Sequence, residues 1–237
     1  MEKMILSEKS ENCRYLSYAA SALAAIPECS LCVSADADRV SISADVQDRA
    51  VREVRRVLHE KIVEIICVGY KYGELRSSVR VNGLTEGERE LLLTALLAAD
   101  FNEDARYVRE RLQGIERHSV DGFYKFRLSR LREKWLDVSA CVPQRISSLQ
   151  LKDFMRYLLS GGKGKVFLRG GEVYDSHCRR LRRSVLMGET SADMRPLQEI
   201  VISGADCVEC IGTLRPEQES VLRRYYVGDV YFSGDKF

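Results

Sequence analysis

The clearest hydrophobic pattern of the chain lies between residues 119 and 138. Apolar residues recur there at steps of four, four, three, four and three, which is the period of one helix face. These residues are Val120, Tyr124, Leu128, Leu131, Trp135 and Val138. Phe123 and Phe126 widen the apolar stripe, and Trp135 is the only tryptophan. The pattern predicts one continuous helix inside a bundle, contacted on several sides.

The residues before this stretch predict a helix, a β-hairpin and a second, longer helix. Apolar residues share one helical face over 11–26, and Pro27 ends that helix. Segments 30–34 and 40–44 flank a turn and predict the hairpin. The long helix is expected over residues 47–72, which would span roughly 38 Å and connect the hairpin to the helical core.

Two capping boxes mark helix starts in the middle of the chain. Thr85 with Glu88, and Ser147 with Gln150, each place a hydroxyl residue three positions before Glu or Gln. Further along, a Gly-Gly turn predicts a hairpin over 165–174. Helices over 176–187, 193–202 and 217–226 and strands over 208–211 and 230–232 are then expected. The final strand–helix–strand favours a parallel or mixed pairing.

These elements predict an α+β fold. We expect a helix, hairpin and long connecting helix over residues 1–75, a helical core over 76–160, and a small αβ module over 161–237.

Composition is that of a globular protein, with 45% hydrophobic and 30% charged residues. The net charge of +2 does not predict a strong field toward nucleic acid or membrane. No apolar run reaches the roughly 20 residues of a membrane span. The start of the chain does not resemble a secretion signal, so we expect a cytoplasmic protein.

Eight cysteines include two Cys-x-x-Cys pairs, Cys29 with Cys32 and Cys207 with Cys210. Such pairs can hold structural zinc, with His177 and Cys178 as extra ligands. However, Cys32 and Cys210 fall in predicted strands, where residues three apart point to opposite faces. We therefore predict no metal site and no cofactor, and keep the four cysteines as alternatives.

Arginines supply the best binding candidates. The predicted basic face is made of Arg127, Arg130, Arg179, Arg180, Arg182 and Arg183. Nucleic-acid binding would require these side chains to converge on one face, unpaired with acids. The simpler explanation is a solvated surface in which arginines pair with neighbouring carboxylates.

The sequence favours no catalytic chemistry. Its three histidines are scattered, and neither an HExxH motif nor a GxSxG motif is present. Gly161-Gly162-Lys163-Gly164-Lys165 runs from helix to strand, unlike a phosphate-binding loop. An enzyme of another type stays an open alternative.

Gly122-Phe123-x-x-Phe126-Arg127-Leu128 is the most specific of several stretches in which the chain resembles the YtxC family of sporulation proteins. Similar stretches include Leu84-Thr85-x-x-Glu88-Arg89, Phe154 to Leu159, and an ending with Glu219 to Leu222 and Val230-Tyr231-Phe232. Residues 139–143 and 203–207 depart from the family pattern.

The resemblance covers about residues 30–232 and implies a sporulation-associated protein without catalytic residues to transfer. We therefore predict a non-enzymatic binding or scaffolding protein with a protein partner. A nucleic-acid-binding protein using the arginines is the alternative.

Overall fold

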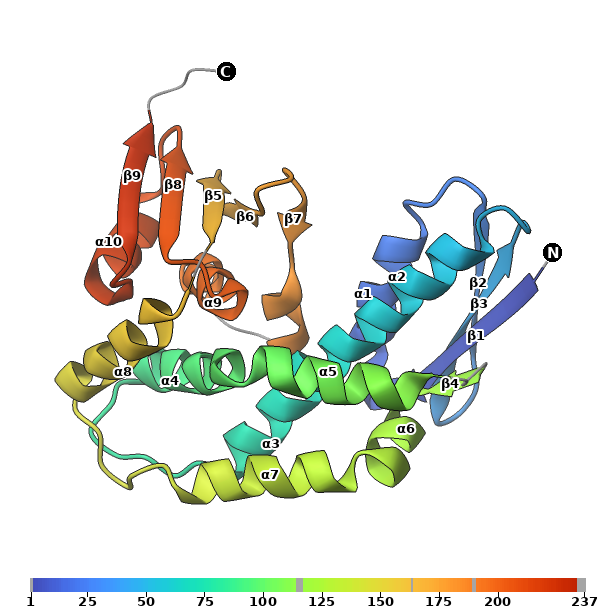
Figure 1. Cartoon of the computed structure of the whole chain (residues 1–237), viewed down its shortest axis with the longest axis horizontal. Helices are drawn as coiled ribbons and strands as arrows, with labels where there is room; N and C mark the ends of the chain where they lie inside the picture. Colours follow the sequence, from blue (N-terminus) through green and yellow to red (C-terminus); the bar gives the residue numbers. More distant parts are fainter. Residues whose placement is uncertain (1, 114–116, 163, 189–190, 234–237) are drawn as a thin grey trace. The chain divides into compact units, whose positions relative to one another are not determined.

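The computed structural model describes residues 2–113, 117–162, 164–188 and 191–233. The fold is α+β, as predicted from the sequence. The chain divides into two compact units. Unit 1 comprises Met1–Glu74 and Asn102–Leu136, and unit 2 comprises Leu75–Phe101 and Asp137–Phe237. Figure 1 labels the elements of both units.

Unit 1 contains a four-stranded sheet and helices from two separate parts of the chain. Helices α3, α5 and α7 begin or end in the other unit. The elements are β1 (Glu2–Lys9), a 3-10 turn (Ser10–Asn12), α1 (Cys13–Leu23), β2 (Cys29–Ala35), β3 (Arg39–Val46), α2 (Val51–Glu64), the π-helix η2 (Ile65–Tyr70), α3 (Lys71–Ser78), α5 (Phe101–Leu112), β4 (Arg117–Ser119), α6 (Val120–Arg127) and α7 (Ser129–Ala140).

The sheet of unit 1 has the order β2-β3-β1-β4. Strand β3 pairs with β2 in the predicted hairpin and with β1 on its other side, both antiparallel, while β4 joins β1 in parallel. Helix α1 packs on the sheet, and α2 packs against α1 (Figure 1). Met4, Leu6, Ile42 and Ala44 are buried on the covered face. Strand β1 is not among the predicted elements, although it is central to the sheet.

The predicted helix over 119–138 is two helices, and this prediction was wrong in its continuity. The break is at Leu128, whose φ of −120° and ψ of 25° leave the helical region. Trp135 is fully buried, as expected, but Phe126 is 75% exposed. Phe126 lies roughly 160° from Tyr124 around α6, so it falls outside the stripe that Val120 and Tyr124 bury.

The long helix is confirmed in outline but contains a π-helical turn at η2. Tyr70, the last residue of this turn, donates a hydrogen bond to Glu8 at 2.7 Å. Lys71 is fully buried and its Nζ lies 2.7 Å from Asp104 Oδ2. Asp104 Oδ2 also accepts a hydrogen bond from Trp135 Nε1 at 2.8 Å. These contacts tie the long helix to β1, α5 and α7 within unit 1.

Burial shifts the pKa values of two further groups in unit 1, Glu8 and His118. Desolvation raises the pKa of Glu8, against the opposing effect of its hydrogen bond with Tyr70. Burial, with a smaller contribution from the nearby His59, lowers the pKa of His118 to about 4. The two imidazole rings meet edge to face, with their centroids 5.2 Å apart.

Unit 2 combines a second sheet with four main helices in its described part. Its elements, besides the parts of α3 and α7 that fall in it, are α4 (Glu86–Ala99), α8 (Ser148–Ser160), β5 (Lys165–Arg169), β6 (Glu172–Tyr174), β7 (Arg180–Leu181), a 3-10 turn (Arg183–Met187), α9 (Arg195–Ser203), β8 (Cys207–Ile211), α10 (Pro216–Tyr225) and β9 (Asp229–Ser233). The sheet has the order β7-β6-β5-β8-β9. Strands β8 and β9 are parallel, which fits the predicted strand–helix–strand.

Helix α9 is central to this unit because it contacts both β6 and α4 (Figure 1). Residues Pro196 to Ile202 of α9 are all buried. The apolar core around it includes Leu91, Leu197, Ile200, Val201 and Val208. Both predicted capping boxes are present, at Thr85 for α4 and at Ser147 for α8. The predicted hairpin turn is made by Gly170 and Gly171, both with positive φ.

The helix predicted over 176–187 is absent from this described segment, and that prediction was wrong. Asp175 accepts hydrogen bonds from the backbone N–H groups of His177 and Arg179, at 2.8 and 2.9 Å. Cys178 adopts a positive φ of 58°. A side chain that captures backbone donors in this way favours a turn over a helix. Of the arginines that follow, Arg180 therefore lies on the short strand β7 and Arg183 in a 3-10 turn, while Arg179 and Arg182 lie in the connecting segments.

The two units differ from the three-part division expected at 1–75, 76–160 and 161–237. The helices of residues 76–160 are shared between the units, with α4 and α8 in unit 2 and α6 in unit 1. Among the residues described, no helix is both long and apolar enough to cross a bilayer.

Candidate ligand site in unit 2

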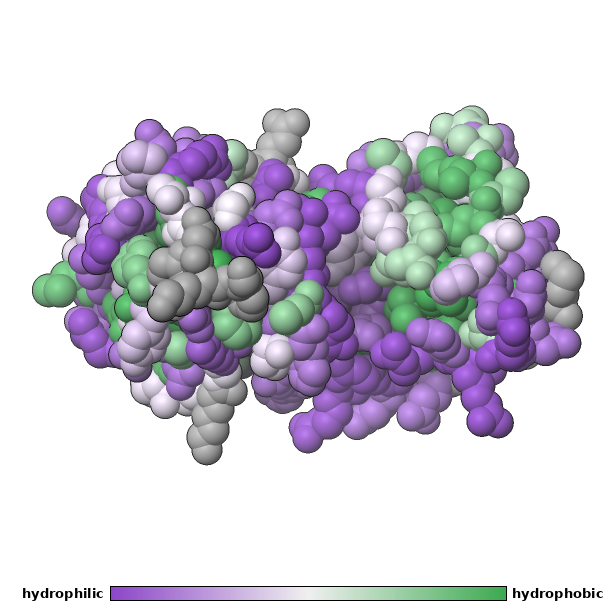
Figure 2. All heavy atoms as spheres, turned by 90° about the horizontal axis from the view of Figure 1, so that it is seen from above, coloured by the Kyte–Doolittle hydropathy of each residue, from purple (hydrophilic) through white to green (hydrophobic). Residues whose placement is uncertain are grey.

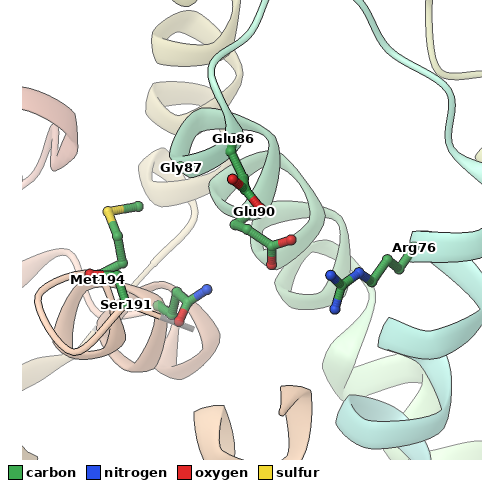
Figure 3. Close-up of a pocket in the computed structure, with 7 residues that line it drawn as sticks. Arg76, Glu86, Gly87, Glu90, Ser191 and Met194 are labelled. Atoms are coloured by element: carbon green, nitrogen blue, oxygen red, sulfur yellow. The ribbon is translucent and has the colours of Figure 1, made fainter. Parts of the chain in front are cut away.

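A cavity of about 360 Å³ opens in unit 2 between the start of α4 and the start of α9. Figure 3 shows its walls. The lining residues are Arg76, Glu86, Gly87, Glu90, Ser191, Met194 and Gln198.

One wall is the first turns of α4. The capping box fixes this start, since Thr85 Oγ1 accepts from Glu88 N–H at 3.3 Å and Glu88 Oε2 accepts from Thr85 N–H at 3.0 Å. Glu86 and Glu90, four residues apart, therefore share one face of the helix. A Cβ added at Gly87 would meet only Met194 Cε, at 3.9 Å, so the glycine leaves this side of the cavity open.

Arg76 enters from α3. In Figure 3 its guanidinium points toward the Glu90 carboxylate. Glu86 lines the cavity and is exposed. With two carboxylates and one guanidinium, the lining carries a net negative charge.

The opposite wall is the turn that precedes α9. Ser191 Oγ accepts a hydrogen bond from Asp193 N–H at 3.3 Å, and Ser191 O accepts from Met194 N–H at 3.1 Å. Asp193 in turn lies 3.2 Å from Arg215. This turn holds the Met194 thioether at the cavity, where Figure 3 shows it facing the start of α4.

Gln198 is the most informative residue of the lining. It is 0% exposed, and neither its Oε1 nor its Nε2 has a hydrogen-bond partner among the described residues. An unpaired buried amide costs about 1–3 kcal/mol. Buried polar groups are nearly always hydrogen-bonded to protein or to ordered water, so water or a ligand is the partner that this amide lacks within the described chain.

The residue next to Gln198 has its own partners. Glu199 Oε2 accepts from Ser184 N–H at 2.7 Å, and Glu199 Oε1 lies 3.5 Å from Arg183 Nε. The Arg183 guanidinium also stacks over the Phe101 ring, 5.3 Å from its centroid. Glu199 and Arg183 therefore compensate each other inside unit 2, in contrast to Gln198.

The cavity thus offers an amide, carboxylates, a hydroxyl and a thioether wall. This set of groups is suited to orienting a small polar ligand through hydrogen bonds, with Met194 as the apolar side chain among them.

The arginines predicted as a basic face are not brought together as a set of free charges. Arg179 meets Asp175 at 2.8 Å, Arg180 pairs with Glu172, and Arg183 faces Glu199. Arg127, Arg130 and Arg182 are exposed without a carboxylate partner in the described part of the chain. Arg127 and Arg130 belong to unit 1, whereas the other four belong to unit 2.

Cys32 and Cys210 lie on strands, as predicted, and each strand begins one residue earlier than expected, with Cys29 as the first residue of β2 and Cys207 as the first residue of β8. All eight cysteines are free thiols. Burial raises the pKa of Cys210 to about 11, which keeps this thiol protonated. No group of three or more His, Cys, Asp or Glu residues suited to a metal ion occurs within the described ranges.

None of the residues that line the cavity is among the site residues predicted from the sequence. One signal was available, because Gln198 and Glu199 interrupt an otherwise apolar run from Leu197 to Ile202. A polar pair inside a fully buried helix requires partners, and only the structure separates the paired residue from the unpaired one.

Comparison with known proteins adds no relative: no family model, curated protein or solved structure matches this chain.

Proposed function

We propose that this protein is a non-enzymatic binding protein that holds a small polar ligand in the cavity of unit 2. The observation that carries this proposal is the fully buried Gln198 amide, which lines the cavity without a protein partner. The neighbouring carboxylates and Ser191 supply further hydrogen-bonding groups at the same place.

Equilibrium dialysis against a bacterial small-molecule extract tests the proposal. The wild-type protein should enrich at least one compound, detected by mass spectrometry. Gly87→Leu should abolish this enrichment, because the new side chain extends into open space at the cavity. Failure of the wild type to enrich any compound would contradict the proposal.

Gly73→Leu is the matched control. Like Gly87, Gly73 is a helical glycine with room for a side chain, since no atom lies within 4 Å of an added Cβ, but Gly73 is exposed and does not line the cavity. This variant should enrich the same compounds as the wild type.

The family resemblance supplies a cellular setting, and we include sporulation in the proposal on that ground. Deletion of the gene in the bacterium that encodes it should lower the number of heat-resistant spores. Affinity capture of the tagged protein from sporulating cells tests the predicted scaffolding role. An unchanged spore count would remove sporulation from the proposal and leave the ligand site untouched.

Ligand binding is favoured over the nucleic-acid alternative. Arg179, Arg180 and Arg183 each face a carboxylate, which neutralises charge that phosphate contacts would need.

A further inference from the structure

We infer that the cavity of unit 2 takes an adenine nucleoside without phosphates. This inference rests on the proposed function, because it names the chemical class of the ligand that the cavity would hold.

The hydrogen-bonding groups of Gln198 favour an adenine base. Its buried amide offers an acceptor and a donor side by side, and neither is used within the described residues. A simple cation would satisfy only the oxygen, and a simple anion only the nitrogen. An adenine edge satisfies both, since it presents an amino donor beside a ring nitrogen acceptor, the pairing that glutamine makes with adenine.

The negative charge of the cavity lining favours a ribose over a phosphate. Exposed Glu86 lines the cavity on α4, four residues from Glu90. A carboxylate is a strong acceptor for ribose hydroxyl groups. The same carboxylates repel a phosphate, and the Arg76 guanidinium that could attract one points toward Glu90 (Figure 3). The site therefore fits a nucleoside better than a nucleotide.

The size and the Met194 wall of the cavity also fit a single nucleoside. A cavity of about 360 Å³ lies near the lower end of the ligand-site range of roughly 300–1,000 Å³. The Met194 thioether forms an apolar wall, and methionine sulfur makes favourable contacts with aromatic rings. A single base with its sugar matches this size, whereas a dinucleotide would exceed it.

Isothermal titration of the purified full-length chain with adenosine, inosine and AMP tests the inference. Adenosine should bind. At the edge where glutamine pairs with the N6 donor and N7 acceptor of adenine, inosine presents two acceptors, O6 and N7, and should bind roughly 5- to 150-fold more weakly. AMP should also bind more weakly than adenosine because of the two carboxylates. Equal binding of adenosine and inosine, or tighter binding of AMP, would overturn the assignment.

Variants locate the binding. Gln198→Leu should weaken the binding of adenosine by the factor that separates adenosine from inosine in the wild type. This variant should bind adenosine and inosine with equal affinity. Gly87→Leu should abolish adenosine binding, and Gly73→Leu should keep the wild-type affinity. If the dialysis experiment enriches a compound that Gly87→Leu loses while adenosine does not bind, the ligand class is wrong and the proposed function stands. If no compound is enriched and adenosine does not bind, both fail.

Discussion

At the scale of single residues, the buried polar groups of this protein differ in whether the chain supplies their partners. Lys71 and Trp135 in unit 1 both contact Asp104, at 2.7 and 2.8 Å, and Lys134 contacts the other oxygen of Asp104 at 3.0 Å. Gln198 in unit 2 and the Nδ1 atom of His118 in unit 1 have no partner among the described residues. The paired groups contribute to stability, while the unpaired ones cost stability and respond to ligand or pH.

Asp104→Asn should destabilise the protein by about 3–5 kcal/mol, because it leaves the buried Lys71 charge without its counter-charge. Denaturant unfolding followed by circular dichroism measures this. Glu103→Gln is the control, since Glu103 also contacts Lys134 at 3.0 Å but its side chain is 63% exposed. The control should change the unfolding free energy by less than about 1 kcal/mol. Equal effects of the two substitutions would argue against a buried charge pair.

Gln198→Leu should raise the free energy of unfolding of the ligand-free protein by about 1 kcal/mol, because it removes an unpaired buried amide. Thermal unfolding provides the measurement. Gln144→Leu, at an exposed position, should stay within about 0.5 kcal/mol of the wild type. A clear loss of stability in Gln198→Leu would show that the amide has a partner such as ordered water.

His118 should make the protein sensitive to mild acid. Its folded-state pKa is about 4, below the ordinary value of 6.5, so the unfolded chain takes up the proton first. The contribution of neutral His118 to the free energy of unfolding is complete above pH 6.5. It is lost progressively as the pH falls toward 4, by up to about 3 kcal/mol. His118→Leu should flatten this part of the stability profile.

Unfolding free energies at a series of pH values provide the comparison. The exposed His177→Leu is the control and should follow the wild type. Glu8 acts in the opposite direction, because its raised pKa gives stability at low pH that is lost as the pH rises. The difference between wild type and variant therefore isolates His118. Identical slopes for the two proteins would rule out this role.

At the scale of elements, local signals in the sequence predict local structure well. The capping boxes, the Gly170-Gly171 turn and Pro216 at the start of α10 depend on neighbouring residues only. Strand β1 was missed because its pairing partners are residues 39–46 and 117–119, and because inward-facing Glu8 interrupts its apolar alternation. The Arg179–Arg183 segment was misjudged because the hydrogen bonds of Asp175 outweigh helix propensity.

The candidate site could not be predicted from sequence because its residues come from α3, α4 and the region of α9, which are distant in the chain.

The surface exposure of edge strand β2 could not be predicted from the sequence either. Its pattern predicted a strand but not that Val33 would be 64% exposed. Figure 2 shows apolar residues gathered on the surface of unit 1, toward the right of the view.

Thr85→Ala should destabilise the protein by about 1–2 kcal/mol, and Ser147→Ala by about 1 kcal/mol or less. Both substitutions remove the cap of a capping box. Thr85 also donates a 2.9 Å hydrogen bond to Glu88, which is buried, whereas Gln150 of the second box is exposed. Denaturant midpoints of the two variants give the order of the effects. The reverse order would contradict a role for burial at the α4 cap.

At the scale of the whole molecule, neither unit is a single continuous piece of chain. Residues 2–74 contribute β1, β2 and β3 to unit 1, but Asp104, Leu128 and Trp135 come from its second segment. The fold therefore depends on contacts between residues that are far apart in sequence, which explains why the expected three-part division differs from the observed units.

A fragment of residues 1–74 alone should not unfold cooperatively, because Lys71 would lack Asp104 and the core would lack Trp135. Urea titration followed by circular dichroism measures this. Addition of a second fragment, residues 102–136, should increase the ordered signal. A sharp unfolding transition of the first fragment alone would contradict the assignment of unit 1.

This arrangement has a consequence during protein synthesis. About 60 residues separate the end of the first segment of unit 1 from the end of its second segment. At roughly 5–20 residues per second, the ribosome needs about 3–12 s to deliver them. Through that interval the Tyr70 ring would lack the Tyr124 ring that packs against it, and the buried Lys71 would lack its carboxylate partner, so we expect molecular chaperones to meet this chain before its first unit is complete.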